Sequence, residues 1–286
     1  MGYSKPVSDA TTPQQQGQER GAEAPASYPC SPELIPQGTI VRGPYSMRFA
    51  RTAEELEQLQ RLRFEVFNLE LKEGLEQSFA TGLDADRFDA VCHHLIVLDK
   101  SDRVIGTYRM QTSEMARHNI GFYSADEFRV EDLPSAVLDG AIEVGRACVA
   151  REFRNRHVLF LLWQGLATYM LHNRKRYLFG CCSLTSQDPE LGRRVMDHLR
   201  ASGHTHETID LAPQPDWRCY DESVAAAPAA GDEAPVELPK LFSLYLRYGA
   251  KVLGRPALDR YFKTIDYLVL LDIEDLSPDS REMFFA

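Results

Sequence analysis

Charged residues interrupt two stretches of the chain whose neighbours are otherwise apolar. Arg109 lies inside one expected strand, and Glu143 and Arg146 lie inside another at residues 141–149. Charges on a central strand are costly unless they are paired, so these residues predict a shared polar site. Positions three apart on a flat strand face opposite sides, but a bulge at Gly145 would turn both side chains toward one cleft. The alternative is a purely structural Glu–Arg pair.

A second polar group precedes these strands. Arg63 falls on the buried side of an expected helix, where the alternative is an arginine that extends along the surface to solvent. The loop at residues 84–89 contains three carboxylates, of which Asp86 and Asp89 are candidate site residues. Such a loop suits an ammonium or a guanidinium. It lacks the glycine and the closing glutamate of a calcium loop, so no metal is expected. A solvent-exposed acidic loop is the alternative.

Basic residues gather after the central strand. Between Arg146 and Arg176, seven lysines and arginines accompany one acidic residue, a local charge of +6 in a chain whose formal charge is −10. We expect an acidic or phosphorylated partner to dock here, helped by a helix N-terminus, and a solvated helix end is the alternative. The residues expected on this surface are Arg151, Arg154, Arg156, His157, Arg174, Lys175 and Arg176.

Composition and charge exclude several classes of function. The 286 residues are 44% hydrophobic, which is enough for a substantial core. The excess of 42 acidic over 32 basic residues argues against nucleic acid as a partner. Apolar runs are much shorter than the ~20 residues that cross a bilayer, and the N-terminus lacks the apolar core of a secretory signal. A cytoplasmic location with reduced cysteines is expected.

Sequence patterns also predict the order of the elements. Residues 1–44 are expected to form a disordered tail, and residues 45–286 a single domain with a mobile insertion at about 212–238. A capping box that begins at Thr52 predicts a helix with apolar positions as far as Leu69. Other helices are expected at 155–173, 189–201 and 239–248, and strands at 45–50, 93–99, 103–112, 141–149, 177–184, 206–211 and 265–273. This order predicts a mixed α+β fold.

Several of these segments together resemble one known group of enzymes. Residues 45–275 are similar to the ornithine lipid N-acyltransferases, within the hemolysin-like N-acyl amino acid synthases and near the acyl-homoserine-lactone synthases. The resemblance implies a GNAT-type fold, with a mixed central sheet flanked by helices. The segments that carry it include Leu62–Phe67, Asp86–Asp89, Cys92–Val97, Gly106–Arg109, Gly121–Ser124, Glu143–Arg146, Leu162–Leu166, Leu178–Leu184 and Tyr245–Lys251.

The resemblance implies transfer of a (3-hydroxy)fatty acyl group from an acyl carrier protein thioester to the α-amine of an amino acid. Ornithine is the expected acceptor, the product is a lyso-aminolipid of ornithine lipid biosynthesis, and no bound cofactor is expected. The alternatives are an acyl-homoserine-lactone synthase, a synthase that uses another amine, and a non-catalytic lipid- or carrier-binding relative. On the family pattern, the active-site residues are Arg63, Asp86, Asp89, Arg109, Glu143 and Arg146.

Roles for these residues follow from the chemistry. Glu143 is the candidate base that deprotonates the α-ammonium, directly or through water. One of the three arginines would hold the carboxylate of the amino acid, while Asp86 and Asp89 would orient the amine or tune the arginines.

One departure bears on the acyl donor. GNAT enzymes that use coenzyme A usually carry a glycine-rich turn before the helix that receives the pyrophosphate, but Arg154–Leu159 contains no glycine. This favours acyl carrier protein over acyl-CoA. Residues 238–251 also pair apolar with basic side chains, which suits peripheral contact with an anionic inner-membrane face or an ordinary helix packed on the core.

Overall fold

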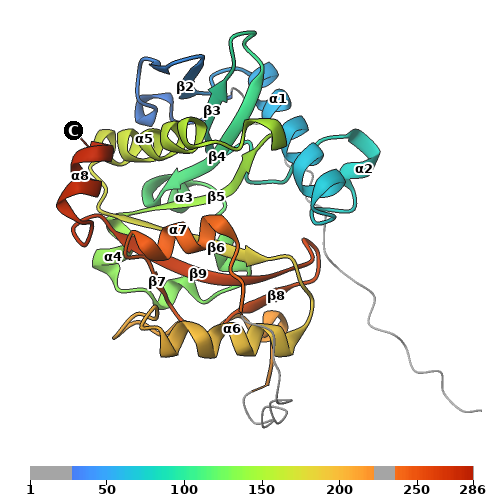
Figure 1. Cartoon of the computed structure of the whole chain (residues 1–286), viewed down its shortest axis with the longest axis vertical. Helices are drawn as coiled ribbons and strands as arrows, with labels where there is room; N and C mark the ends of the chain where they lie inside the picture. Colours follow the sequence, from blue (N-terminus) through green and yellow to red (C-terminus); the bar gives the residue numbers. More distant parts are fainter. Residues whose placement is uncertain (1–27, 222–235, 286) are drawn as a thin grey trace, which may run out of the picture.

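The computed structural model describes residues 28–221 and 236–285 as one mixed sheet with helices against both of its faces (Figure 1). The strands are β1 Ile40–Arg42, β2 Tyr45–Phe49, β3 His93–Leu98, β4 Val104–Thr112, β5 Ala141–Val149, β6 Tyr177–Leu184, β7 Lys251–Val252, β8 Ala257–Asp259 and β9 Thr264–Asp272. The helices are α1 Ala53–Phe64, α2 Ser78–Thr81, α3 Ser113–His118, α4 Ser135–Asp139, α5 Arg156–His172, α6 Pro189–Ala201, α7 Lys240–Arg247 and α8 Pro278–Phe285. The predicted α+β arrangement is confirmed.

The sheet has the order β1-β2-β3-β4-β5-β6-β9-β7, and β8 also pairs with β9. All neighbouring strands are antiparallel except β5 and β6, which are parallel and are joined by α5. Alternate residues of β3 belong to different cores: Leu95 and Val97 pack with α5, whereas Ile96 and Leu98 pack with α1. Because successive side chains of a strand point to opposite faces, α5 and α1 cover opposite sides of the sheet.

The two parallel strands separate soon after they meet. Their pairing covers only Ala141–Glu143 on β5 and Tyr177–Phe179 on β6. Just beyond this point, Gly180 lies directly against the backbone carbonyl of Val144, and a Cβ at position 180 would collide with it. The sheet is therefore open between the C-terminal halves of β5 and β6.

The bulge predicted on β5 is present, but it falls one residue later than expected. Arg109 of β4 pairs with Gly145, whereas Thr107 pairs with Cys148, so Arg146 and Ala147 together oppose a single residue of β4. Arg146 adopts the left-handed conformation, with φ of 51°. A bulge re-aims the side chains around it, and here it turns the Arg146 side chain toward the opening of the sheet.

The helix predicted to begin at Thr52 is confirmed, together with its capping box. The Glu55 amide donates to Thr52 Oγ1 at 3.2 Å, and the Thr52 amide donates to Glu55 Oε2 at 3.3 Å. The regular α1 ends at Phe64, and the chain continues through a π-helical segment at Glu65–Glu70.

Three predictions about irregular segments need correction. The expected tail at 1–44 is too long, because β1 pairs with β2 and Ile35 is buried; residues 1–27 lie outside the described part of the chain. Residues 206–211 do not form a strand, because within them only Leu211 makes an isolated bridge, to Gly254; Thr205, just before this segment, bridges Val252. The expected insertion at 212–238 begins later, because Cys219 is buried, and its residues 222–235 are outside the described ranges.

The amphipathic segment at residues 238–251 fits its alternative interpretation. Phe242, Tyr245 and Leu246 of α7 are buried, and the hydroxyls of Tyr245 and Tyr108 form a hydrogen bond of 3.0 Å. The apolar face of this helix therefore covers the sheet rather than a membrane. Within the described residues, no helix is both long enough and apolar enough to cross a bilayer.

Candidate active site

The opening between β5 and β6 contains a cavity of about 310 Å³. Its lining combines polar side chains with aromatic and aliphatic side chains from β4, β6 and α7. Its lining includes Tyr108, Glu143, Arg146, Cys182, Phe242 and Tyr245. A cavity lined by both polar and apolar side chains suits a reacting group attached to an acyl chain.

Glu143 is the predicted site residue that lies at the point of separation. Its Oε2 accepts from Gln111 Nε2 at 2.7 Å and from the Tyr123 amide at 2.9 Å. Its Oε1 accepts from the Ser124 amide at 2.8 Å and from the Ser124 hydroxyl. A carboxylate has about four acceptor positions, so these four donors fix the group in one orientation on the cavity wall.

Arg63 is completely buried and serves an internal ion-pair cluster. It donates to Asp84 Oδ1 through Nε at 2.7 Å and through Nη2 at 2.5 Å, and it donates to Asp89 Oδ1 through Nη1 at 2.8 Å. With 0% of its side chain exposed, Arg63 does not reach the cavity. The surface-arginine alternative is therefore wrong for this residue, and so is a role for it as a direct clamp on a substrate.

Arg109 and Arg146 extend the same cluster toward the cavity. Arg109 Nη1 donates to Asp86 Oδ1 at 2.6 Å and to Asp89 Oδ1 at 3.1 Å. Arg146 Nη2 donates to the other oxygen of Asp86 at 3.0 Å. The 84–89 loop is therefore a buried partner of three arginines and not the exposed acidic loop of the alternative interpretation. Arg146 does not pair with Glu143, which excludes the simple Glu–Arg pair.

The charges of this cluster stabilise one another against the cost of burial. Burial alone would raise the pKa of Asp89, but Arg63, the hydrogen bond from His94 and Arg109 hold that pKa well below its usual range. Burial alone would lower the pKa of Arg109, but Asp86 and Asp89 raise it well above its usual value. Asp86, Asp89 and their arginine partners therefore favour their charged forms.

The basic residues predicted to form one docking surface divide into two groups. Arg151, Arg154, Arg156 and His157 lie before and at the start of α5, whereas Arg174, Lys175 and Arg176 follow its end. A helix of 17 residues is about 25 Å long, so a single patch is excluded.

The second group is also engaged within the protein. Lys175 is buried, and its Nζ donates to Glu114 Oε1 and to the Asp139 carbonyl, both at 2.6 Å. Arg176 pairs with Asp272 and Glu274. In the first group, Arg154 is held by Glu70 at 2.7 Å, while Arg151, Arg156 and His157 are exposed. The basic surface that remains is therefore at the start of α5.

The N-terminus of α5 is capped by the side chain of Asn155. Asn155 Oδ1 accepts from the His157 amide at 2.9 Å and from the Val158 amide at 3.2 Å. These are among the amides that a helix N-terminus otherwise offers to an anion. The side chain of Asn155 thus occupies a position that a phosphate would need.

Sequence reasoning missed several residues that contact the predicted ones. Asp84 was recognised only as one acidic residue of a loop, although it makes the shortest ion pair with Arg63. Ser124 and Gln111 carried no signal of their own, because neutral polar side chains are common in loops and strands. Only the buried position of Glu143 required that such donors exist.

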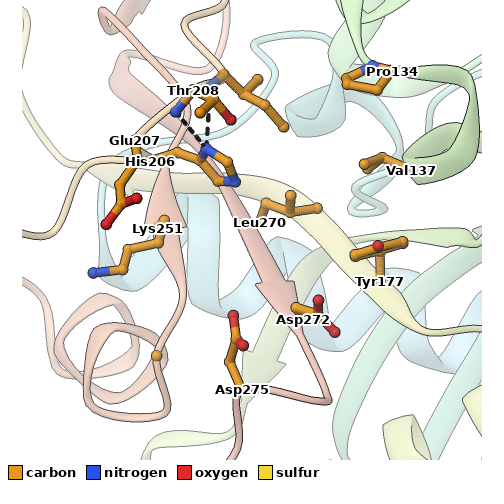
Figure 2. A pocket seen from close by; sticks show the side chains of 12 residues that line it. Pro134, Val137, Tyr177, His206, Glu207, Thr208, Lys251, Leu270, Asp272 and Asp275 are labelled. Carbon is orange, nitrogen blue, oxygen red and sulfur yellow. Dashed lines mark hydrogen bonds between the residues drawn. The ribbon is translucent and has the colours of Figure 1, made fainter.

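A larger hollow of about 500 Å³ lies elsewhere, beside the ends of β6, β7 and β9 (Figure 2). Figure 2 shows His206 bound to the following turn, where the amides of Thr208 and Ile209 donate to His206 Nδ1 at 3.2 and 3.1 Å. Its lining includes none of the predicted site residues. Volume alone therefore does not identify the site in this protein.

Comparisons with known proteins agree on one kind of protein. The family model "Acetyltransferase (GNAT) domain" matches residues 62–164. Two curated relatives are named L-ornithine N(alpha)-acyltransferase. The one from Brucella abortus (strain 2308) is 33% identical over 260 residues, covering 82% of this chain and 86% of the relative. The one from Rhizobium meliloti (strain 1021) is 32% identical over 238 residues, covering 80% of each.

Solved structures with a similar arrangement are more distant in sequence. The AHL synthase LasI is 10% identical with a TM-score of 0.45, covering 87% of this chain and 96% of that one. The N-acyl amino acid synthase FeeM from uncultured soil microbes is 13% identical with a TM-score of 0.45, covering 80% of this chain and 91% of that one.

Proposed function

This chain belongs to the L-ornithine N(alpha)-acyltransferase family, and on that premise we propose that it acylates the α-amino group of ornithine. The GNAT-type fold and the amide-forming acyltransferase activity predicted from the sequence agree with this membership. The observation that carries the proposal is the position of Glu143, fixed by four donors on the wall of the cavity where β5 and β6 separate.

Glu143 acts in this proposal as the base for the acceptor amine. The α-ammonium passes a proton to the Ser124 hydroxyl, which passes its own proton to Glu143 Oε1 along their existing hydrogen bond. The free amine then attacks the thioester carbonyl carbon, and the carbon–sulfur bond breaks as the tetrahedral intermediate collapses. The leaving thiolate takes up the second proton lost by the amine nitrogen, and Glu143 releases the first to solvent. Backbone amides of β5 beyond Glu143, where β6 no longer pairs, stabilise the oxyanion.

The arginines have different roles because only one reaches the cavity. Arg146 lines it and is the candidate for binding the carboxylate of the amino acid. Arg63 and Arg109 act through Asp86 and Asp89, which hold the guanidinium of Arg146 and the surrounding loop in place. They are positioning residues.

We propose an acyl carrier protein thioester as the donor. The capping of the His157 and Val158 amides by Asn155 leaves them unable to bind the pyrophosphate of coenzyme A without a rearrangement. The exposed Arg151, Arg156 and His157 beside them suit the acidic surface of a carrier protein. Acyl-CoA would lack the amide contacts on which such donors usually depend.

The first experiment tests the reaction itself. The purified chain is incubated with a 3-hydroxyacyl carrier protein and single amino acids, and the products are identified by mass spectrometry. We expect an N-acyl product with ornithine, and loss of more than about 100-fold in kcat for Glu143→Gln. Glu131→Gln, which changes an exposed glutamate, is the matched control. Near-normal turnover by Glu143→Gln contradicts the assigned base.

A second experiment tests the donor surface. Arg156→Glu reverses a charge at the start of α5, and Arg174→Glu reverses an exposed charge at its other end. We expect Arg156→Glu to raise the KM for the acyl carrier protein by at least about tenfold at unchanged kcat, because rim charges act mainly on association. Arg174→Glu should leave KM unchanged. Equal effects of the two variants would contradict docking at the start of α5.

A further inference from the structure

A second group of carboxylates lies beside the cavity and takes no part in the steps above. Asp266 of β9 lines the cavity, and Glu127 lies next to it. A carboxylate oxygen of each and the Cys181 sulfur lie within 4.8 Å of one another. Asp266 is 3% exposed and Glu127 is 1% exposed. Within the described residues, both oxygens of Glu127 and Oδ1 of Asp266 have no hydrogen-bond partner.

Buried acceptors without partners are exceptional in folded proteins. Arg146 lowers the pKa of Glu127 only as a minor contribution, and its guanidinium is already held by Asp86 and lies 3.5 Å from Asp84. Burial, followed by the charge of Asp266, raises the pKa of Glu127 well above its usual value. The two buried carboxylates are therefore poorly stabilised as charges, and a cationic ligand in the cavity would stabilise them.

The position of this pair relative to Glu143 is set by one short helical turn. The 3-10 segment Tyr123–Asp126 carries Ser124, which donates to Glu143, and the Glu127 amide donates back to the Ser124 carbonyl at 3.2 Å. Residues three apart on such a turn share a face and are separated by about 6 Å along its axis. The α- and side-chain nitrogens of an extended 2,5-diamino acid are also about 6 Å apart, given bonds of about 1.5 Å.

We propose that Glu127 and Asp266 bind the side-chain ammonium of the acceptor and so select a diamino acid over a neutral one. This inference rests on the proposed acylation of ornithine and assigns the part of the cavity that recognises its side chain. With the α-amine at Ser124 and Glu143, the second ammonium lies one turn away between the two carboxylates. Charge-assisted hydrogen bonds there satisfy the acceptors that are otherwise without a partner.

The test compares ornithine with norvaline, which has the same carbon chain but lacks the second amine. Wild type, Glu127→Gln and Asp266→Asn are assayed with the 3-hydroxyacyl carrier protein and each amino acid, with Glu131→Gln as the control. We expect the ratio of kcat/KM for ornithine to that for norvaline to fall by at least about 100-fold in both cavity variants, because a site with buried charges rejects a ligand that cannot pair them. Retained turnover of norvaline shows that the variants are folded and competent.

The outcomes separate this inference from the function on which it depends. Wild type that acylates no amine overturns both. Wild type that prefers ornithine, with the preference unchanged in Glu127→Gln and Asp266→Asn, overturns the side-chain site alone. Metal analysis of the purified chain adds a readout besides activity. A stoichiometric divalent metal that is lost in Glu127→Gln would assign the cluster to a metal and would also overturn the inference.

Discussion

Arg63 is the residue whose removal should cost the most stability, because it is the buried centre of the ion-pair cluster. It makes five hydrogen bonds to Asp84 and Asp89. In Arg63→Met, Asp89 keeps Arg109 at 3.1 Å, but Asp84 keeps only Arg146 at 3.5 Å. The variant therefore leaves about one buried carboxylate uncompensated, which costs about 3–5 kcal/mol of unfolding free energy. Thermal unfolding followed by circular dichroism should show a Tm lower by about 6–20 °C.

Two further variants make this prediction specific. Arg61→Met removes an exposed arginine two positions away on α1, whose partner is Glu57, and should change stability by less than about 0.5 kcal/mol. Asp84→Asn added to Arg63→Met removes the charge left unpaired and should recover at least about 1 kcal/mol. A loss below about 1 kcal/mol for Arg63→Met, or no recovery in the double variant, would refute the idea that Arg63 compensates these charges.

Three other predictions concern different parts of the molecule. Gly180→Ala should lower the free energy of unfolding by about 1–3 kcal/mol and remove most of the activity, because the new Cβ would collide with the Val144 carbonyl. A Cβ at position 145 meets no atom within 4 Å, so Gly145→Ala should have the same urea unfolding curve as wild type. Burial lowers the pKa of His93 to about 4. Between about pH 6.5 and pH 4, the imidazole of His93 is therefore protonated in the unfolded chain but neutral in the folded chain. Wild type should therefore lose about 2 kcal/mol more stability than His93→Asn between pH 7 and pH 5 in urea titrations, and parallel curves would contradict this. Lys175→Met should lower the Tm without changing the KM for the carrier protein, since Lys175 is buried; a raised KM would argue against this.

The sequence was informative where a residue contradicted its surroundings. Thr52 and Glu55 predicted the start of α1 because a capping box acts within four residues. Glu143 and Arg146 were recognised as site residues because charges are rare inside a central strand. Asp86 was predicted in the same site, although its pairing with Arg146, 60 residues away, was not specified. Ser124, which lies 19 residues from Glu143, was not predicted as its donor. Only the pairing of strands brings them together.

The errors at the edges of the fold have a similar origin. Leu34 and Ile35 are followed by proline, glutamine and glycine, so no periodic pattern showed that Ile35 packs against the core. The bulge on β5 was expected at Gly145 because glycine tolerates unusual backbone angles. The residue that adopts them is Arg146, whose ion pair with Asp86 compensates for the conformation. Local propensity was outweighed by a contact distant in sequence.

The charge distribution of the whole site fits the amine acceptor proposed above. Arg63, Arg109 and Arg146 are balanced by Asp84, Asp86 and Asp89, so this cluster presents almost no net charge to the cavity. The acidic groups outside this cluster are Glu143 and Asp266, which line the cavity, and Glu127, which lies beside Asp266. A cavity of this kind concentrates ammonium groups and repels acids other than one that reaches Arg146. On the proposed function, the balanced cluster provides rigidity, and the few carboxylates outside it select the acceptor.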